Sequence, residues 1–487
     1  MRVLRHAVPG AGKTTRIIKE AKEVLERGGR AWLTAFGKKN SQDFRRKMGW
    51  LPEAQKERLL ISTIHAEAFH FLNTRPSKNL TAFLFENDSK FGLHFSDKAK
   101  RQAGAMVENV CLLDSGTEDD LCYMEVQRLR ARGQTWKDTT FTGSPADRVK
   151  HVWDILQSGF SRGYWDFMWL LEESDRRNLT FRADYVAVDE INDLTPLQCR
   201  IVGRSEGSKV VFCGDLNQSI HGWAGVDIAA ILALPHDTVE YQNESYRLTT
   251  EVAGFADKII ERLKDKSGKN IVPLAGSGAV LYDLNFRSVL SKLPTLGNAM
   301  VLGRTNYIVD QARRFALDTG ANVILSESDV LQSELCSLIK ERPPTFPMEK
   351  IEAVLGSWLP SGRFWKHGAK KKLREQTTKW MSWSVLFEEY GTPDLERTMK
   401  GELDWYEGRP NFDPNKPSVS FSTIHSAKGL EEKNVVVLRD LSNRVREGLT
   451  KNEGEEVRLV YVAATRARQN LIVSQLDCGG GGNPYLG

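Results

Sequence analysis

The first side chains that could do chemistry lie in the stretch VPGAGKTT, residues 8–15. Its glycines allow backbone N–H groups to close around phosphate oxygens, and the lysine can place its ammonium against the β- and γ-phosphates. The next hydroxyl is a ligand for Mg²⁺. This is the Walker A arrangement, with Ala7 where the first consensus glycine usually stands. It predicts a nucleoside triphosphate site made by Gly10, Ala11, Gly12, Lys13, Thr14 and Thr15.

A pair of carboxylates, Asp189 and Glu190, follows the apolar run at 185–188. The run is typical of a strand buried on both faces, and parallel sheets bind ligands at the C-terminal ends of such strands. One carboxylate there can hold Mg²⁺ while the next positions or deprotonates the attacking water, so the pair favours hydrolysis over simple binding. A solvated acidic turn is the alternative interpretation, and the buried strand directly before the pair argues against it.

A further strand at 209–215 leads into the stretch LNQSIHGWAG. Because Gln218 follows this strand, it is placed to sense the γ-phosphate. Trp223 is a candidate platform for stacking on a base, although a lone tryptophan more often belongs to a hydrophobic core.

Elements of an α/β fold must position these groups. Residues 2–7 predict a short buried strand before the glycines, and apolar residues at helical spacing predict a helix that ends at Gly28-Gly29. Further strands are expected at 280–284, 299–304, 435–438 and 471–475.

The composition is that of an ordinary globular protein. Its 487 residues suggest about three or four structural units. The net charge of +5 is compatible with a polyanionic partner without identifying one. The cysteines lack zinc-site spacing, and neither a membrane-spanning run nor a signal peptide is expected, which points to the cytoplasm of a bacterial or host cell.

The ordered set of motifs resembles the UvrD/Rep/PcrA family of superfamily 1 DNA helicases. The phosphate loop and the Asp-Glu pair are joined, in the family's order, by LTAFGKKNSQDF (33–44), ISTIHAEAF (61–69), YWDF (164–167), GDLNQSIHGWAG (214–225), NESYR (243–247), VSFSTIHSAKGLE (419–431) and RLVYVAATRAR (458–468). Any one of these stretches could be accidental, whereas the whole set in this order is very hard to reach by chance.

The resemblance implies roles in ATP hydrolysis, with ATP and Mg²⁺ as cofactors. Asp189 would stand beside Mg²⁺, and Glu190 would be the hydrolytic carboxylate. Arg247 and Arg466 would reach the γ-phosphate as arginine fingers from the second lobe, which makes hydrolysis depend on closure of the cleft.

The same resemblance implies contacts to the base, the ribose and a DNA strand. Tyr246 would stack on the base, and Glu431 would contact the ribose. Aromatic faces would stack on DNA bases, while hydroxyls and cations hold phosphates without reading sequence. The residues in the family's DNA-contacting positions are Phe36, Thr63, His65, Trp223, Thr423, His425 and Lys428. In these motifs a stacking role for the two aromatic residues is favoured over a place in the core.

The motif order implies an α/β fold with two RecA-like lobes, each a parallel sheet with flanking helices that carries a mostly helical insertion. The implied ranges are 1–74 and 166–256 for lobe 1A, 75–165 for insertion 1B, 257–306 and 417–478 for lobe 2A, 307–416 for insertion 2B, and 479–487 for a flexible tail. The Lys- and Trp-rich stretch 365–390 predicts a duplex-contacting patch or, with slight preference, an amphipathic helix.

Some positions depart from the family's pattern. Asn192 stands where relatives usually carry glutamine, while His221 and Ala224 stand where they often carry tyrosine and arginine. Only six residues precede Ala7, which leaves no room for the Gln-containing motif that recognises adenine in relatives. We therefore expect a relaxed preference among nucleoside triphosphates.

The sequence thus predicts an ATP-dependent DNA helicase that translocates on single-stranded DNA, 3′ to 5′ by the family's polarity, and unwinds at junctions with duplex. The alternatives are a translocase that displaces proteins with little unwinding, a DNA-binding module with an inactive P-loop, and a P-loop kinase or GTPase. The intact ATP-site side chains argue against the inactive module, and the motifs after residue 418 argue against the kinase or GTPase. The prediction leaves room for a loading protein, and it includes no membrane partner.

Overall fold

The computed structural model describes residues 1–35, 37–73, 79–96, 117–324, 415–449, 453–476 and 482–486, together with Ala99 and two short strands at 346–347 and 380–381. Within these ranges, no helix is both long enough and apolar enough to cross a membrane. Except for the strand pair β11 (Phe346–Pro347) and β12 (Trp380–Met381), the Lys- and Trp-rich stretch and its surroundings lie outside the described residues.

Six parallel strands form the first sheet, in the order β3-β2-β4-β5-β1-β6. They are β1 (Arg2–Ala7), β2 (Ala31–Ala35), β3 (Leu59–Thr63), β4 (Tyr185–Asp189), β5 (Lys209–Gly214) and β6 (Thr238–Gln242). The central strands are buried on both faces, as their continuous apolar runs predict. Because all strands point the same way, the phosphate loop after β1 and the carboxylates at the end of β4 meet at one edge.

Helices cover both faces of this sheet. The helix predicted after the glycines is α1 (Lys13–Glu26). It buries Ile17, Ala21 and Leu25 against one face of the sheet, because residues four apart lie on the same side of a helix. Helix α2 (Lys38–Met48) packs in the same cluster as α1, and the short helix α3 (Glu53–Lys56) precedes β3. The other face carries α4 (Ile64–Leu72), α9 (Phe167–Arg176), α10 (Pro196–Gly203) and α11 (Ile228–Leu232).

A helical layer with its own core lies between β3 and β4 in the chain. It contains α5 (Leu80–Glu86), α7 (Glu118–Arg132) and α8 (Ser144–Ser161), which pack around one apolar cluster. The fully buried Arg130 of α7 joins this layer to α9, because its guanidinium pairs with Asp166 at 2.7 Å and with Glu172 at 2.6 Å.

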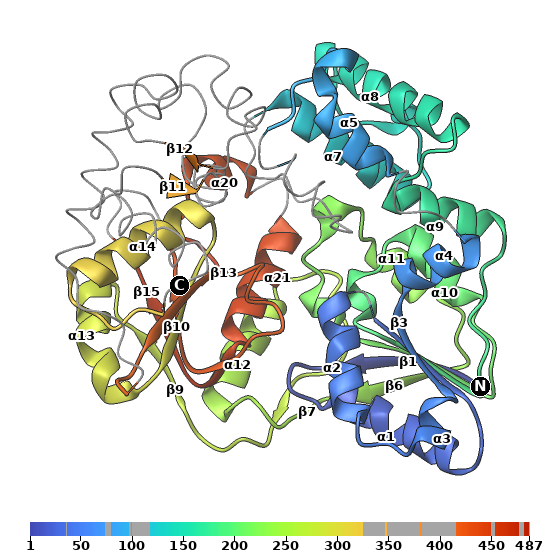
Figure 1. Cartoon of the computed structure of the whole chain (residues 1–487). Helices are drawn as coiled ribbons and strands as arrows, with labels where there is room; N and C mark the ends of the chain where they lie inside the picture. The colour runs from blue at the N-terminus through green and yellow to red at the C-terminus, as the bar shows by residue number, and fades with distance from the viewer. Residues whose placement is uncertain are drawn as a thin grey trace.

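Five parallel strands form the second sheet, in the order β13-β10-β14-β15-β9. They are β9 (Ala279–Tyr282), β10 (Ala299–Gly303), β13 (Val419–Thr423), β14 (Glu432–Leu438) and β15 (Ala467–Ser474). One face is covered by α13 (Phe286–Leu296) and α14 (Asn306–Asp318), and the short helix α20 (Asn443–Gly448) follows β14. Two further helices, α12 (Thr250–Ile260) and α21 (Glu453–Ala464), lie between the two sheets (Figure 1).

The structure corrects three details of the predicted layout. The boundary at 256 cuts α12, which packs as a whole on the second sheet through Val252 and Ile259. The boundary at 306 separates α14 from the core of the second sheet, although Ile308 and Ala312 are buried in that core.

The predicted flexible tail is the third correction. Its residues 482–486 pack on the second lobe, where Leu486 is 1% exposed within the apolar core. Asn483 donates from its side-chain amide to Glu456 Oε1 at 2.8 Å. The run of glycines suggested flexibility, but the apolar and amide side chains that follow it find buried partners.

Candidate active site between the two sheets

The glycine-rich loop before α1 needs glycine at two positions. Gly10 and Gly12 have φ values of 74° and 73°, in the left-handed region that glycine adopts without strain. A Cβ atom at Gly10 would lie 2.4 Å from the Cβ of Arg247, so no larger residue fits there. Gly12 is the N-cap of α1, whose first residue is Lys13. The unbonded N–H groups of that first turn are therefore available to phosphate oxygens.

Lys13 and Thr14 lie against the two strand-end carboxylates. Thr14 Oγ1 donates to Asp189 Oδ2 at 3.1 Å, and Lys13 Nζ lies 3.9 Å from Glu190 Oε1. Burial would lower the pKa of Lys13, but the carboxylates around it, Glu190 foremost, raise that pKa overall. Burial and the charge of Glu190 raise the pKa of Asp189 to about 6. Burial would also raise the pKa of Glu190, but the ammonium groups of Lys13 and Lys428 lower it overall, which favours the ionised form that a general base needs.

The Thr14 hydroxyl and the Asp189 carboxylate fit a magnesium ion. Both are hard oxygen ligands, and they already lie within 3.1 Å of each other. In the described ranges, no group of three or more His, Cys, Asp or Glu side chains could hold a metal ion by itself. That pattern suits Mg²⁺, which usually binds through one or two protein ligands plus substrate phosphates and water.

Glu190 has a strained backbone. Its φ of 56° is in the left-handed region, which costs a non-glycine residue roughly 1 kcal/mol or more. The turn is held by the Glu190 N–H group, which donates to Asp189 Oδ1 at 3.0 Å. Strain of this kind persists where the surroundings fix it, and here it accompanies a carboxylate at the end of a buried strand.

Arg466 is the side chain that joins the second lobe to the phosphate end of the cleft. It lies between α21 and β15, and its Nη2 donates to Gln218 Oε1 at 3.3 Å. Its other groups donate to the carbonyls of Leu430 and Val462 at 3.2 and 3.0 Å. The guanidinium is almost fully buried, and burial, together with the charge of Arg247, lowers its pKa to about 10. A buried cation is thus aimed at the predicted sensor of the γ-phosphate.

The other residues predicted for the nucleotide lie nearby. Arg247, predicted to come from the second lobe, lies in the connection between β7 (Glu244–Ser245) and α12. Its Nε pairs with Glu431 Oε2 at 2.5 Å. Tyr246 is 67% exposed, and its N–H group donates to Gly10 O at 3.0 Å. A ring that is open to solvent and anchored to the phosphate loop is suited to stack on a base.

The predicted DNA contacts of the first lobe lie in three different environments. The Thr63 hydroxyl caps α4 by accepting a backbone N–H group. His65 is 4% exposed and packs edge-on against Phe167 with ring centroids 5.7 Å apart. Trp223 packs partly buried against the core of the helical layer around α7, and Phe36 lies outside the described residues.

The predicted DNA contacts of the second lobe follow β13. The Thr423 hydroxyl accepts the backbone N–H group three residues later at 3.2 Å. Burial and neighbouring cations lower the pKa of His425 to about 3, so its ring is neutral at neutral pH. Lys428, predicted to hold a DNA phosphate, donates to Asp193 Oδ1 at 2.5 Å and to the Gln218 carbonyl at 3.0 Å. In this conformation its ammonium bridges the two lobes.

Two carboxylates of the cleft were not assigned from the sequence. Asp215 follows β5, is 4% exposed, and accepts the hydroxyl of Tyr461 from the second lobe at 3.4 Å. Burial raises its pKa to about 6. Its signal was a carboxylate at the end of a buried strand beside β4, the same argument that identified Asp189. Asp193, the partner of Lys428, carried no comparable signal.

The phosphate loop, the strand-end carboxylates and the buried arginine define a two-lobed P-loop protein with its cleft between two parallel sheets. The chain belongs to the family of UvrD-like helicases. Residues 2–238 match the UvrD/REP helicase N-terminal domain, and residues 406–477 match the UvrD-like helicase C-terminal domain.

Curated relatives of the chain are named DNA helicases. The chain is 22% identical over 339 residues to F-box DNA helicase protein 1 of Schizosaccharomyces pombe. The alignment covers 64% of this chain and 37% of that protein. It is 30% identical over 93 residues to the ATP-dependent DNA helicase PcrA of Staphylococcus aureus, in an alignment that covers 18% of this chain and 13% of that protein. The chain thus spans well under half the length of these relatives. The crystal structure of Arterivirus nonstructural protein 10 (helicase) aligns with 97% of this chain and 59% of its own at 12% identity and a TM-score of 0.33, too low for inference about the site.

Proposed function

We propose that this protein is an ATP-dependent DNA helicase, which couples ATP hydrolysis to 3′-to-5′ translocation on single-stranded DNA and to unwinding at junctions with duplex. The observation that carries the proposal is the contact between Gln218 of the first lobe and Arg466 of the second. Groups for one γ-phosphate come from both lobes, so hydrolysis and the relative position of the lobes depend on each other. The cytoplasm of a bacterial or host cell would supply both ATP and DNA.

The residues present suit an in-line attack of water on the γ-phosphate. The amides of the loop around Gly12 and the ammonium of Lys13 hold the phosphates, and Thr14 and Asp189 would hold Mg²⁺, which spreads the developing charge when it is bound. Glu190 accepts the proton of the attacking water. Oxygen–phosphorus bond formation to water accompanies cleavage of the bond to ADP, and phosphate leaves.

Arg466 links this chemistry to motion. The charge that develops on the transferred phosphoryl group attracts the guanidinium, and an arginine contributes only when the second lobe is docked. Loss of the γ-phosphate removes that attraction, so the lobes separate more easily after each turnover. Alternation between the two positions would move the lobes along a strand bound across both.

The DNA strand is proposed to cross the carboxyl edges of both sheets, because the predicted contact residues lie at or after the ends of β3, β5 and β13. Trp223 would leave its packing on the helical layer to stack on a base. The ammonium of Lys428 would leave the Asp193 carboxylate and bind a DNA phosphate, so one anionic partner would replace another. Contacts of these kinds read no sequence.

Strand displacement from tailed duplexes tests this function. A duplex with a 3′ single-stranded tail is expected to be unwound in the presence of ATP, while a 5′-tailed and a blunt duplex remain intact. Unwinding from the 5′ tail alone would reverse the polarity. If the protein displaces streptavidin from biotinylated single strands but separates no duplex, the activity is that of a translocase.

A further inference from the structure

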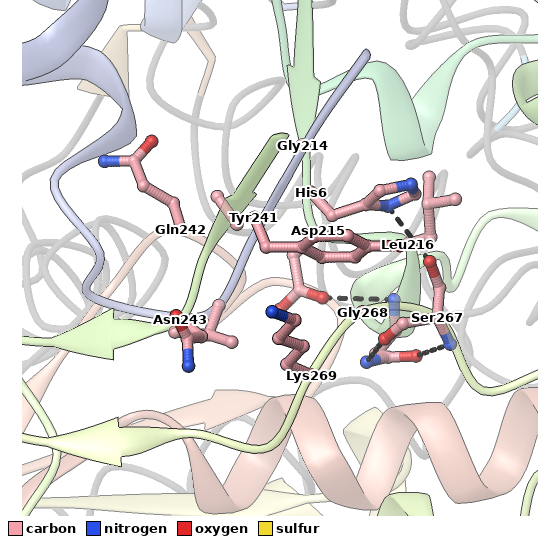
Figure 2. Close-up of a pocket in the computed structure, with 13 residues that line it drawn as sticks. His6, Gly214, Asp215, Leu216, Tyr241, Gln242, Asn243, Ser267, Gly268 and Lys269 are labelled. Atoms are coloured by element: carbon pink, nitrogen blue, oxygen red, sulfur yellow. Dashed lines mark hydrogen bonds between the residues drawn. The ribbon is translucent and has the colours of Figure 1, made fainter. Parts of the chain in front are cut away.

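A loop between the lobes contacts both of them. Residues 261–271 leave α12 on the second sheet, cross to the first lobe, and enter β8 (Val272–Pro273), which pairs with β7. The loop borders a small pocket at the carboxyl edge of β1, β5 and β6 (Figure 2). It is mostly exposed to solvent, so its position depends on a few specific contacts.

On the first lobe, an asparagine binds the backbone of this loop. Asn217 is 5% exposed and lies in η5 (Leu216–Gln218), the turn after β5. Its Nδ2 donates to the Ser267 carbonyl at 2.7 Å, and its Oδ1 accepts the Ser267 N–H group at 3.1 Å. The side-chain amide of Asn217 thus forms hydrogen bonds with both the N–H group and the carbonyl of Ser267, as the backbone of a neighbouring strand would.

The side chain of Ser267 makes a separate contact. Its hydroxyl lies 3.0 Å from His6 Nδ1, and the His6 ring stacks on Tyr241 with centroids 5.5 Å apart (Figure 2). Lys269 lies over the Tyr241 ring at 5.2 Å. Removal of the hydroxyl would therefore leave the two backbone bonds to Asn217 in place.

At its other end the loop is held by the second lobe. Asp265 pairs with Arg458 of α21 at 2.8 Å, and α21 leads directly to Arg466. The residue after Asn217 is Gln218, which Arg466 contacts at 3.3 Å. Tyr461 of α21 also touches Asp215, the residue before the turn, at 3.4 Å. The loop therefore adds a further link between α21 and the turn, beside the contacts of Tyr461 and Arg466.

We infer that Asn217 is a positioning residue, which clamps loop 265–269 to the turn that carries Gln218 and so fixes that turn relative to α21. The inference rests on the proposed function, because it assigns the clamp a part in ATP turnover. We assign Asn217 no part in the chemistry itself. It acts by holding Gln218 where Arg466 can share the γ-phosphate with it, and an error of about 1 Å in such an arrangement can cost up to about a hundredfold in rate.

Asn217→Ala tests the inference with two readouts. The turn itself should survive, because Asp215 still accepts the backbone N–H group of residue 217. Under native conditions, we expect trypsin to cut faster at Lys266 and Lys269 in the released loop. The kcat of ATP hydrolysis on single-stranded DNA should fall at least about tenfold, while the KM for ATP changes less than about twofold. A merely structural loss would lower the melting temperature without this split.

Ser267→Ala is the matched control, because it changes the same contact region and keeps both backbone bonds. It should retain slow cleavage and the wild-type kcat. Faster cleavage of Asn217→Ala with unchanged kcat would overturn the positioning role, and unchanged cleavage would overturn the clamp. If the wild-type protein shows no ATPase activity on DNA, the proposed function fails, while the cleavage rates still decide whether Asn217 holds the loop.

Discussion

Replacement of Arg466 by methionine would separate what this side chain does for stability from what it does for catalysis. The buried guanidinium has a pKa of about 10, below the 12.5 of an exposed arginine. A folded-state pKa below the unfolded value means that folding disfavours the charged form, by about 3 kcal/mol at neutral pH. Methionine removes this cost. It also removes hydrogen bonds to Gln218, Leu430 and Val462, worth about 1 kcal/mol each, so the two effects nearly cancel.

We therefore expect Arg466→Met to change the free energy of unfolding by less than about 1 kcal/mol, measured by urea denaturation. Turnover should respond very differently. An arginine at a γ-phosphate contributes about 10³-fold or more to kcat, so phosphate release on saturating single-stranded DNA should fall by at least that factor.

Arg468→Met is the control for this experiment. Arg468 lies two residues away, its side chain is 62% exposed, and its Nη1 is 3.8 Å from Glu431 Oε1. Exposed pairs at such distances contribute little, so kcat should stay within about twofold of the wild type. Turnover by Arg466→Met within about tenfold of the wild type would refute the finger role. A stability loss above about 3 kcal/mol would refute the reasoning about its buried charge.

Three other substitutions probe separate parts of the structure. Glu190→Gln should stop phosphate release yet retain binding of a fluorescent ATP analogue, because the charge of the base is lost and its size is kept; persistent turnover would place the base elsewhere. Asp166→Ala should lower the free energy of unfolding by about 3–5 kcal/mol in urea, because it strips the buried Arg130 of one of its two carboxylates. A loss under about 1 kcal/mol would mean that Glu172 alone satisfies the guanidinium. Leu486→Ala should lower the free energy of unfolding by about 2–3 kcal/mol in urea, because it empties a buried site. An unchanged urea midpoint would mean that the tail is flexible, as first predicted.

The elements of the nucleotide site were predictable because their signals are local. The glycines, Lys13 and Thr14 occupy consecutive positions, and β1 has the predicted bounds. The strand that ends at Asp189 was visible as a short apolar run, since both of its faces are buried. Parallel strands then bring their carboxyl ends to one edge without further information.

Contacts between distant segments were not predictable in this way. Lys428 and Asp193 are 235 positions apart, and nothing near either residue indicates that they pair. Trp223 has a side chain that could stack on a base, but its packing depends on a helical layer built from other residues. The tail was misjudged because its burial is decided by the second lobe, on which Leu486 docks.

Steady-state ATP hydrolysis, measured with and without single-stranded DNA, tests the motor function most directly. The two-lobed site predicts weak hydrolysis by the protein alone and strong stimulation by the strand, since a bound strand holds both lobes and brings Arg466 to the γ-phosphate. Stimulation that depends on Glu190 and Arg466 would agree with this mechanism. Hydrolysis that is indifferent to DNA, or absent with it, would contradict the coupling between strand and cleft.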